Sequence, residues 1–229
     1  MTSKIKKGAV SALYKTGLMS KMTRKNFDRH IKKYASLLRT LDVGSGGNPY
    51  KGFFPNRVSM DIVDDNDVDV VADVHDMKVF ENGEFDNVLC TEALEHFCNP
   101  FKAIEEMKRV LKKDGLLILT TRFIMPLHEV PNDYFRFTEY GLKNLLKDFE
   151  IVELHEDENT IETLGVLMQR IGYQTDTLHF KPFKLFWFIL SKITKLFSFV
   201  LTKQYGEINN KNEVKNIMTS GYLVICKKK

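Results

Sequence analysis

The stretch LDVGSGGNP at residues 41–49 decides the fold of this chain. Residues 40–43 form a short, mainly apolar run that predicts a buried strand, and a glycine-rich turn follows it directly. Glycine in such a turn lets the backbone approach a ligand where a Cβ atom would clash. The stretch therefore predicts a strand that ends in a ligand-binding turn. The alternative is a plain tight turn between a strand and the next element.

Strands and helices alternate along the sequence that follows. The pattern predicts further strands over residues 57–62, 68–71, 85–90, 115–121, 149–154 and 222–226. Helices are predicted over residues 92–96, 100–112 and 139–146, with a turn at Asp114-Gly115. This alternation is typical of an α/β fold with a parallel sheet and helices on both faces. The apolar strands suit a sheet that is covered on both sides.

The composition is that of an ordinary globular protein. The chain has 229 residues, of which 43% are hydrophobic and 28% charged, so it is neither disordered nor fibrous. Its three cysteines, Cys90, Cys98 and Cys226, form no CxxC pair, which fits a reducing compartment and argues against a disulfide framework. We read no secretory signal at the N-terminus and expect a cytoplasmic protein.

Charge is distributed unevenly along the chain. Residues 1–40 carry a net charge of +10, residues 41–180 carry −14 and residues 181–229 carry +8. The two basic ends of the chain favour contact with an anionic partner. The alternative is that these lysine-rich ends only face water. Because no nucleic-acid reading module is recognisable, we expect no nucleic-acid partner.

Acidic residues end the next two predicted strands. Asp61 follows the glycine turn by about 20 residues, the position from which a carboxylate accepts hydrogen bonds from ribose hydroxyls. Asp73 ends the third strand, and with the backbone N–H of Val74 it offers the groups that recognise an adenine edge. Each acid alone could cap a helix. Together they lie at the carboxyl edge of the sheet, where open α/β folds bind ligands.

The motifs as a set resemble a class I S-adenosylmethionine-dependent methyltransferase of type 11. They are LDVGSGGNP (41–49), MDIVDD (60–65), ADVHDM (72–77), FDNVLCTEALEHFCNP (85–100) and IEEMKRVLKKDGLLILTT (104–121). The resemblance implies a Rossmann-like, seven-stranded sheet in the order 3-2-1-4-5-7-6, with the seventh strand antiparallel. It also implies S-adenosylmethionine as the cofactor.

The resemblance assigns cofactor contacts residue by residue. Gly44 and Gly46 would border the methionine part, and Asp42 would orient its ammonium group, directly or through water. The remaining contacts implied are Asp61 and Ile62 at the ribose, Asp73 and Val74 at the adenine, and Cys90 and Thr91 along the methionine and sulfonium. Pro49 departs from the dinucleotide fingerprint GxGxxG, which disfavours a dehydrogenase.

Two segments offer groups for the acceptor side. Glu92 and His96 are four residues apart and would share a face of the predicted helix, although the Glu-His pair at 95–96 favours a structural role. The loop 126–138 contains His128, the candidate general base, because the ordinary pKa of histidine suits proton transfer. We see no clustered metal-ligand set, and the predicted reaction needs no metal.

Tyr134 and Arg136 in the same loop are candidates for acceptor binding, with Arg136 contacting an anionic group. In the structural alternative, Arg136 pairs with Asp133 and Thr138 caps the next helix. The run HEVPNDYFRFT (128–138) resembles methyltransferases of bacterial glycan and cell-envelope biosynthesis. The predicted acceptor is therefore a hydroxyl of a sugar or of a lipid-linked glycan. An alternative acceptor is a small lipid such as a quinone. An alternative function is that of a non-catalytic scaffold that binds the cofactor.

The predicted domains are a basic helical extension (1–39) and a methyltransferase domain (40–229) with a helical insertion at about 160–215. Within the insertion, residues 180–203 are apolar and aromatic apart from a narrow stripe that includes Lys184, Ser191 and Lys195. Its charge-free runs are too short to cross a bilayer, so we expect a helix that lies on a membrane surface. A helix buried on the sheet and a dimer interface are the alternatives. The basic N-terminus would add attraction to anionic lipid.

Overall fold

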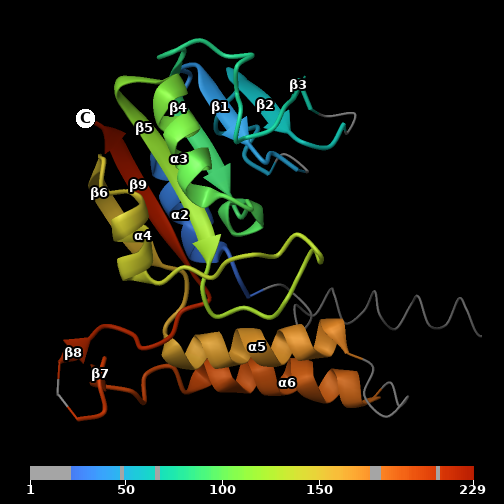
Figure 1. The fold of residues 1–229 in the computed structure, drawn as a ribbon. Coiled ribbons are helices and arrows are strands. Elements are labelled where there is room, and N and C mark those ends of the chain that lie inside the picture. Colours follow the sequence, from blue (N-terminus) through green and yellow to red (C-terminus); the bar gives the residue numbers. More distant parts are fainter. Residues whose placement is uncertain (1–21, 47–48, 65–67, 176–181, 210–211) are drawn as a thin grey trace, which may run out of the picture. The chain divides into compact units, whose positions relative to one another are not determined.

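The computed structural model describes residues 22–46, 49–64, 68–175, 182–209 and 212–229. The chain forms two compact units. Of the described residues, the sheet unit comprises those within 26–157 and 221–229, and the helical unit comprises those within 158–220 together with 22–25 (Figure 1). The first 21 residues of the predicted basic extension lie outside the described residues.

Seven strands form one sheet in the order β3-β2-β1-β4-β5-β9-β6. They are β1 (Thr40–Val43), β2 (Arg57–Asp61), β3 (Val70–Val71), β4 (Phe85–Thr91), β5 (Leu111–Arg122), β6 (Phe149–Glu156) and β9 (Gly221–Lys228). The first five strands pair in parallel, and β9 runs antiparallel between β5 and β6. The predicted strand order, with its antiparallel last strand, is confirmed.

The predicted start of the fifth strand, directly after a turn at Asp114-Gly115, differs from the structure. Leu111 already pairs with Phe85, and Leu116 pairs with Asn87, so the intervening residues form an irregularity inside β5. Asp114 has a positive φ of 62° there, a conformation that a bulge tolerates. The strand therefore begins four residues earlier than the pattern indicates.

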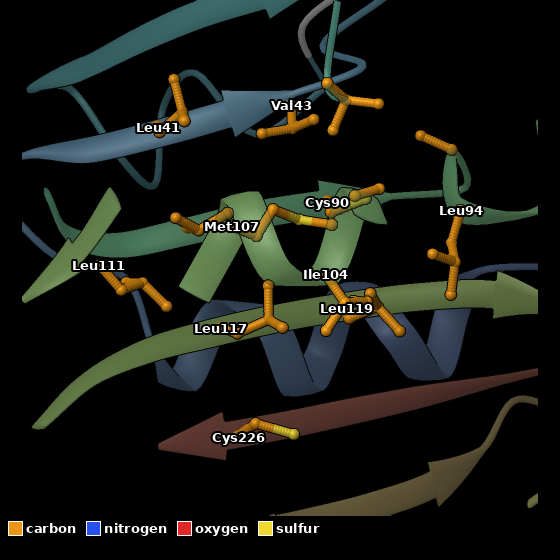
Figure 2. Packing of buried hydrophobic residues seen from close by; sticks show 14 of the residues in the cluster. Leu41, Val43, Cys90, Leu94, Ile104, Met107, Leu111, Leu117, Leu119 and Cys226 are labelled. Carbon is orange, nitrogen blue, oxygen red and sulfur yellow. The ribbon is translucent and has the colours of Figure 1, made fainter. Parts of the chain in front are cut away.

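Two helices cover one face of the sheet, α3 (Pro100–Val110) and α4 (Glu139–Leu145). The Asn99 side chain caps α3 by accepting a hydrogen bond from the Lys102 amide at 3.1 Å. Ile104 and Met107 of α3 pack on the apolar side chains of the central strands, as Figure 2 shows. This cluster is the larger core of the sheet unit.

The opposite face of the sheet is covered by α2 (Lys25–Lys33). Phe27 and Ile31 of this helix are fully buried and cluster with residues of β4, β5 and β9. Between β1 and β2, described residues 49–56 form turns and no helix, and Tyr50 and Phe54 join the same cluster. The end of the basic N-terminal region is therefore part of the core that holds the sheet.

The helical unit is built on α5 (Thr160–Gln174) and α6 (Pro182–Leu196), with a short ribbon of β7 (Gln204–Tyr205) and β8 (Glu213–Val214). Two glycines of α5 let the helices approach closely. A Cβ on Gly165 would lie 2.8 Å from the Ser191 carbonyl oxygen, and a Cβ on Gly172 would lie 3.1 Å from the Phe188 ring. No helix among the described residues is long and apolar enough to cross a bilayer.

The orientation of α6 differs from that expected of a helix with its polar stripe toward water. Ser191, on the predicted polar stripe, is fully buried, and its hydroxyl donates to the Phe188 carbonyl at 2.7 Å. An apolar row instead faces outward, namely Phe186, Ile189, Ile193 and Leu196. The reason is the close contact at the α5 glycines, which leaves room for a small side chain such as serine and not for a large apolar one.

Candidate cofactor and acceptor site

The candidate cofactor residues meet at one edge of the sheet. In the parallel register, Val43 of β1 pairs with Met60 of β2 and with Cys90 of β4. The glycine turn, Asp61 and Thr91 therefore follow one another along the carboxyl edge. This is the place where open α/β sheets bind ligands.

Gly44 is sterically required in the turn. Its φ is +64°, and a Cβ atom there would lie 2.6 Å from the Cβ of Ala93. The amides of Gly44 and Ser45 donate to the Met60 carbonyl at 2.9 and 3.2 Å. The turn is thus fixed between β2 and the segment after β4, in a conformation that side chains with a Cβ rarely adopt.

The same turn contains an unpartnered polar atom. Among the described residues, the buried Ser45 hydroxyl has no hydrogen-bond partner, and a Cβ added at Gly46 would meet nothing within 4 Å. An unpaired buried hydroxyl costs about 1–3 kcal/mol, which a polar ligand would recover. These two features fit the polar methionine end of S-adenosylmethionine. Sequence reasoning missed Ser45, whose only signal is its place between two glycines.

Asp42 is buried on β1 and engaged by a neighbouring strand. Arg57 of β2 donates from Nη1 to its Oδ2 at 2.8 Å. Burial raises the pKa of the Asp42 carboxyl to about 7, although the Arg57 guanidinium acts in the opposite direction. The residue expected at the cofactor ammonium group therefore also holds β1 to β2.

The residues expected at the ribose lie at the end of β2. Asp61 is half-buried, and its Oδ1 accepts a hydrogen bond from the Val63 amide at 3.2 Å. Ile62 next to it is exposed, which leaves its side chain accessible to a ligand at this edge.

The residues expected at the adenine lie just beyond β3. The Asp73 carboxylate accepts hydrogen bonds from the amide and the Nδ1 of His75, at 2.9 and 2.6 Å, and these bonds hold the pKa of Asp73 below its usual value. The other ring nitrogen of His75 accepts from the Asn99 amide at 3.3 Å. Val74 is buried. The histidine thus ties the acid to the start of α3.

Cys90 and Thr91 end β4 and are both buried. Burial raises the pKa of the Cys90 thiol well above its usual value, so the thiol stays protonated at neutral pH. Cys90 is therefore a packing residue at this edge and not a nucleophile.

The predicted helix over residues 92–96 is wrong, and Glu92 and His96 do not share a helical face. Only a single 3-10 turn, η1 (Leu94–His96), forms, and Glu92 has a positive φ of 57°. The cause is a long-range ion pair. Arg122 at the end of β5 is buried, and its guanidinium contacts the carboxylates of Glu92 and Asp157.

Glu95 connects three parts of the site. Its side chain is fully buried, and its Oε2 accepts a hydrogen bond from the Thr121 hydroxyl of β5 at 2.8 Å. Its backbone carbonyl accepts from the amides of Tyr134 and Phe135 at 3.0 and 3.1 Å. The structural role that the Glu-His pair favoured is therefore evident for Glu95, which joins the end of β4 to β5 and to the loop after it.

His128, the candidate base, lies beside this carboxylate. Its Nε2 is 3.8 Å from Glu95 Oε1, and its Nδ1 is 3.2 Å from the Pro126 carbonyl oxygen. The Glu95 carboxylate raises the pKa of His128 above its ordinary value, burial opposes this, and Asp133 adds to the increase. The His96 ring contacts the His128 ring edge to face, with centroids 4.8 Å apart.

The guanidinium of Arg136 is occupied by its own loop. It donates to both carboxylate oxygens of Asp133 at 2.6 Å and to the carbonyl oxygens of Met125, Pro126 and Phe135. Thr138 caps α4 by accepting from the Gly141 amide at 3.0 Å. These contacts favour the structural alternative for Arg136. Tyr134 is half-exposed, with its hydroxyl 3.2 Å from Asn132 Oδ1.

Comparisons with known proteins find similarity to methyltransferases. A family model described as a methyltransferase domain matches residues 41–119. An uncharacterized protein from Methanocaldococcus jannaschii is 30% identical over 139 residues, which cover 55% of this chain and 64% of that protein. A ubiquinone biosynthesis O-methyltransferase from Glaesserella parasuis is 42% identical over 43 residues, which cover 19% of this chain and 18% of that enzyme. The chain thus spans less than two thirds of the length of either relative.

Solved structures share the fold. A protein assigned as a methyltransferase, from Bacillus halodurans, superposes with a TM-score of 0.55 at 22% identity, over 87% of this chain and 97% of that one. A SAM-dependent methyltransferase from Archaeoglobus fulgidus superposes with a TM-score of 0.53 at 15% identity, over 90% and 92% of the two chains. Residues 41–119 are therefore similar to a methyltransferase domain, the chain shares its fold with these solved structures, and S-adenosylmethionine is the cofactor that the comparisons support.

Proposed function

We propose that this chain transfers a methyl group from S-adenosylmethionine to a hydroxyl oxygen of an acceptor. The observation that carries the proposal is the turn after β1, where Gly44 has a φ of +64° and the buried Ser45 hydroxyl has no partner in the described part of the chain. Such a turn accepts a polar ligand at close range, and Asp61 follows at the next strand end. The match of residues 41–119 to the methyltransferase domain supports the same conclusion.

The residues at the sheet edge would hold the cofactor. Gly44, Ser45, Gly46 and Asp42 would bind its methionine part, and Cys90 and Thr91 would border the sulfonium. Asp61 and Ile62 would hold the ribose, and Asp73 with Val74 would contact the adenine. When bound, the cofactor supplies an electrophilic methyl group on a positively charged sulfur, so the protein must mainly align the acceptor oxygen.

The loop after β5 would serve the acceptor. His128 would accept the hydroxyl proton at Nε2, which it can do in the tautomer whose Nδ1–H donates to the Pro126 carbonyl. Arg136 would position His128 by holding Asp133, whose Oδ2 accepts from the His128 amide at 3.0 Å. Tyr134 would contact the acceptor.

The surface of this loop favours an acceptor that has an apolar part. Leu127, Val130, Tyr134 and Phe135 are all exposed near His128 in the sequence. Exposed apolar side chains that gather in one loop are typical of a binding surface. A lipid-linked glycan is the acceptor we propose. A quinone is the alternative, which the short similarity to the Glaesserella parasuis ubiquinone biosynthesis enzyme supports.

A second role, binding to an anionic membrane surface, is favoured by α6. Phe186, Ile189, Ile193 and Leu196 repeat at helical spacing and are 42–69% exposed. Phe199 and Val200 follow as exposed residues, and Lys192 and Lys195 lie on the same helix. An apolar row with lysines beside it suits a helix that lies in a membrane interface.

Replacement of Asp61 tests the cofactor site. We expect the wild-type protein to bind S-adenosylmethionine in calorimetry with a Kd on the order of micromolar, and Asp61→Ala to bind about a hundredfold more weakly, because two hydrogen bonds to a carboxylate of about 1.5 kcal/mol each are lost. The exposed Asp64 provides the matched control, Asp64→Ala, which should keep wild-type affinity. No binding by the wild type, or equal loss in both variants, would contradict the proposal.

Turnover with His128→Ala tests the acceptor side and separates an enzyme from a scaffold. Labelled methyl transfer would be followed with lipid-linked glycans, quinols and free sugars as acceptors. We expect product from the lipid-linked glycan and a loss of about 10²–10⁴-fold in His128→Ala, the usual contribution of a positioned base. His155→Ala serves as the histidine control. Full turnover in His128→Ala would remove this residue from the reaction, and absence of product with every acceptor would favour a scaffold.

Replacement of Arg136 tests whether the guanidinium is structural. Because it donates to a carboxylate and to three carbonyls, Arg136→Ala should lower the free energy of unfolding by about 2 kcal/mol, measured by urea denaturation without cofactor or acceptor. Lys143→Ala, which removes the exposed ion pair with Glu139, should change it by less than about 0.5 kcal/mol. An Arg136→Ala variant as stable as the wild type would favour acceptor binding instead.

Liposome sedimentation tests the membrane role. The wild type should sediment with anionic vesicles at low salt and detach at high salt, since salt screens the lysines. A double variant, Phe186→Asp with Ile193→Asp, should stay in the supernatant. Val79→Asp with Val152→Asp places the same charges on exposed positions of the sheet unit and should sediment like the wild type. Wild-type protein that remains in solution at low salt would refute the role.

A further inference from the structure

Two histidines and a buried carboxylate meet beside the acceptor loop. Glu95, His96 and His128 each direct one potential ligand atom to a common point, with these atoms all within 4.8 Å of one another. The residues come from η1 and from a loop more than thirty positions later in the sequence. We propose that this cluster binds a divalent transition-metal ion of the zinc type.

The Glu95 side chain indicates that the cluster has room for a ligand. It is fully buried, and its Oε1 has no hydrogen-bond partner among the residues that the structure describes. His128 Nε2 lies 3.8 Å from this oxygen, which is beyond hydrogen-bond distance. A buried carboxylate oxygen left in this state is costly, and a coordinated cation would satisfy it.

Both histidines are oriented as metal ligands usually are. The His96 Nδ1 lies 2.6 Å from the Asn132 carbonyl oxygen, and the His128 Nδ1 lies 3.2 Å from the Pro126 carbonyl oxygen. A ring that donates from Nδ1 to a carbonyl keeps the lone pair of Nε2 free. Asp133, 3.6 Å from His128 Nδ1, supplies the outer carboxylate that often accompanies such a histidine.

The chemical types of the three ligand groups indicate which metal ion the cluster would bind. Two imidazoles and one carboxylate form a known catalytic zinc set, which leaves a coordination position open for water or substrate. Bonds of about 2.0–2.2 Å place ligand atoms about 3.5 Å apart, so one histidine ring must close by about 1 Å. Both rings are only partly buried, with side chains 14% and 17% exposed, and can make this adjustment.

A bound ion would occupy Nε2 of His128 and replace it as the group that acts on the acceptor. In that state the acceptor hydroxyl would bind at the open position, and the ion would lower its pKa so that the proton passes to solvent water before the oxygen takes the methyl group. This role rests on the proposed methyl transfer, whereas the binding of the ion does not. The two are therefore tested separately.

Calorimetry with Zn²⁺ on tag-free protein, without cofactor or acceptor, tests the site. We expect one ion per chain, and a loss of affinity of at least about a hundredfold in His96→Ala and in His128→Ala, more than an outer-shell partner usually costs. The absorption spectrum of the Co²⁺ form should show a site of low coordination number in the wild type and lose it in both variants. S-adenosylmethionine affinity, measured in parallel, reports that the variants are folded.

The second histidine cluster provides the control. His30, Glu153 and His155 also lie within 4.8 Å of one another, but the two rings stack with centroids 3.8 Å apart and Lys33 Nζ is 3.4 Å from His30 Nδ1. His155→Ala should therefore keep wild-type Zn²⁺ affinity. No Zn²⁺ binding by the wild type would overturn the proposal. So would binding that survives His96→Ala and His128→Ala or that disappears in His155→Ala.

Discussion

The buried carboxylate of Glu95 is the constraint on which the acceptor side of the structure depends. Its side chain is held by Thr121 of β5, and its carbonyl receives two amides from the loop after β5. A charged group away from water must keep its partners, since an unpaired one costs several kcal/mol. The loop that contains His128 is therefore fixed to the end of β4. Through these contacts, Glu95 holds the acceptor loop at the same edge of the sheet as the glycine turn.

The cofactor side depends on a steric constraint of a different kind. Gly44 lies so close to Ala93 that a Cβ has no room, and the register of β1 with β2 and β4 brings the turn, Asp61 and Thr91 to one edge. These groups sit on a rigid sheet that is packed on both faces, whereas the acceptor groups sit on a loop. Such a division is common in α/β enzymes, because loops vary while the scaffold stays constant. It explains why the cofactor is easier to identify here than the acceptor.

The sequence predicts an α/β fold with alternating strands and helices because the apolar strands and the glycine turn are local patterns, and the resemblance to methyltransferases adds the strand order that the sheet shows. The sequence does not predict what depends on distant partners. Glu92 leaves the expected helix because Arg122, thirty residues on, is buried beside it. Ser191 turns inward because of glycines on another helix. The contact between His128 and Glu95 also cannot be predicted from a local pattern, because the two residues are more than thirty positions apart in the sequence.

The central claim is that the turn after β1 and the ends of β2 and β3 form the S-adenosylmethionine site. A crystal structure with S-adenosylhomocysteine bound tests it most directly. The account predicts the amino-acid part over Gly44 and Gly46 with a hydrogen bond to the Ser45 hydroxyl, the ribose at Asp61 and the adenine beside Val74. A ligand bound elsewhere, or a Ser45 hydroxyl still without a partner in the complex, would contradict it.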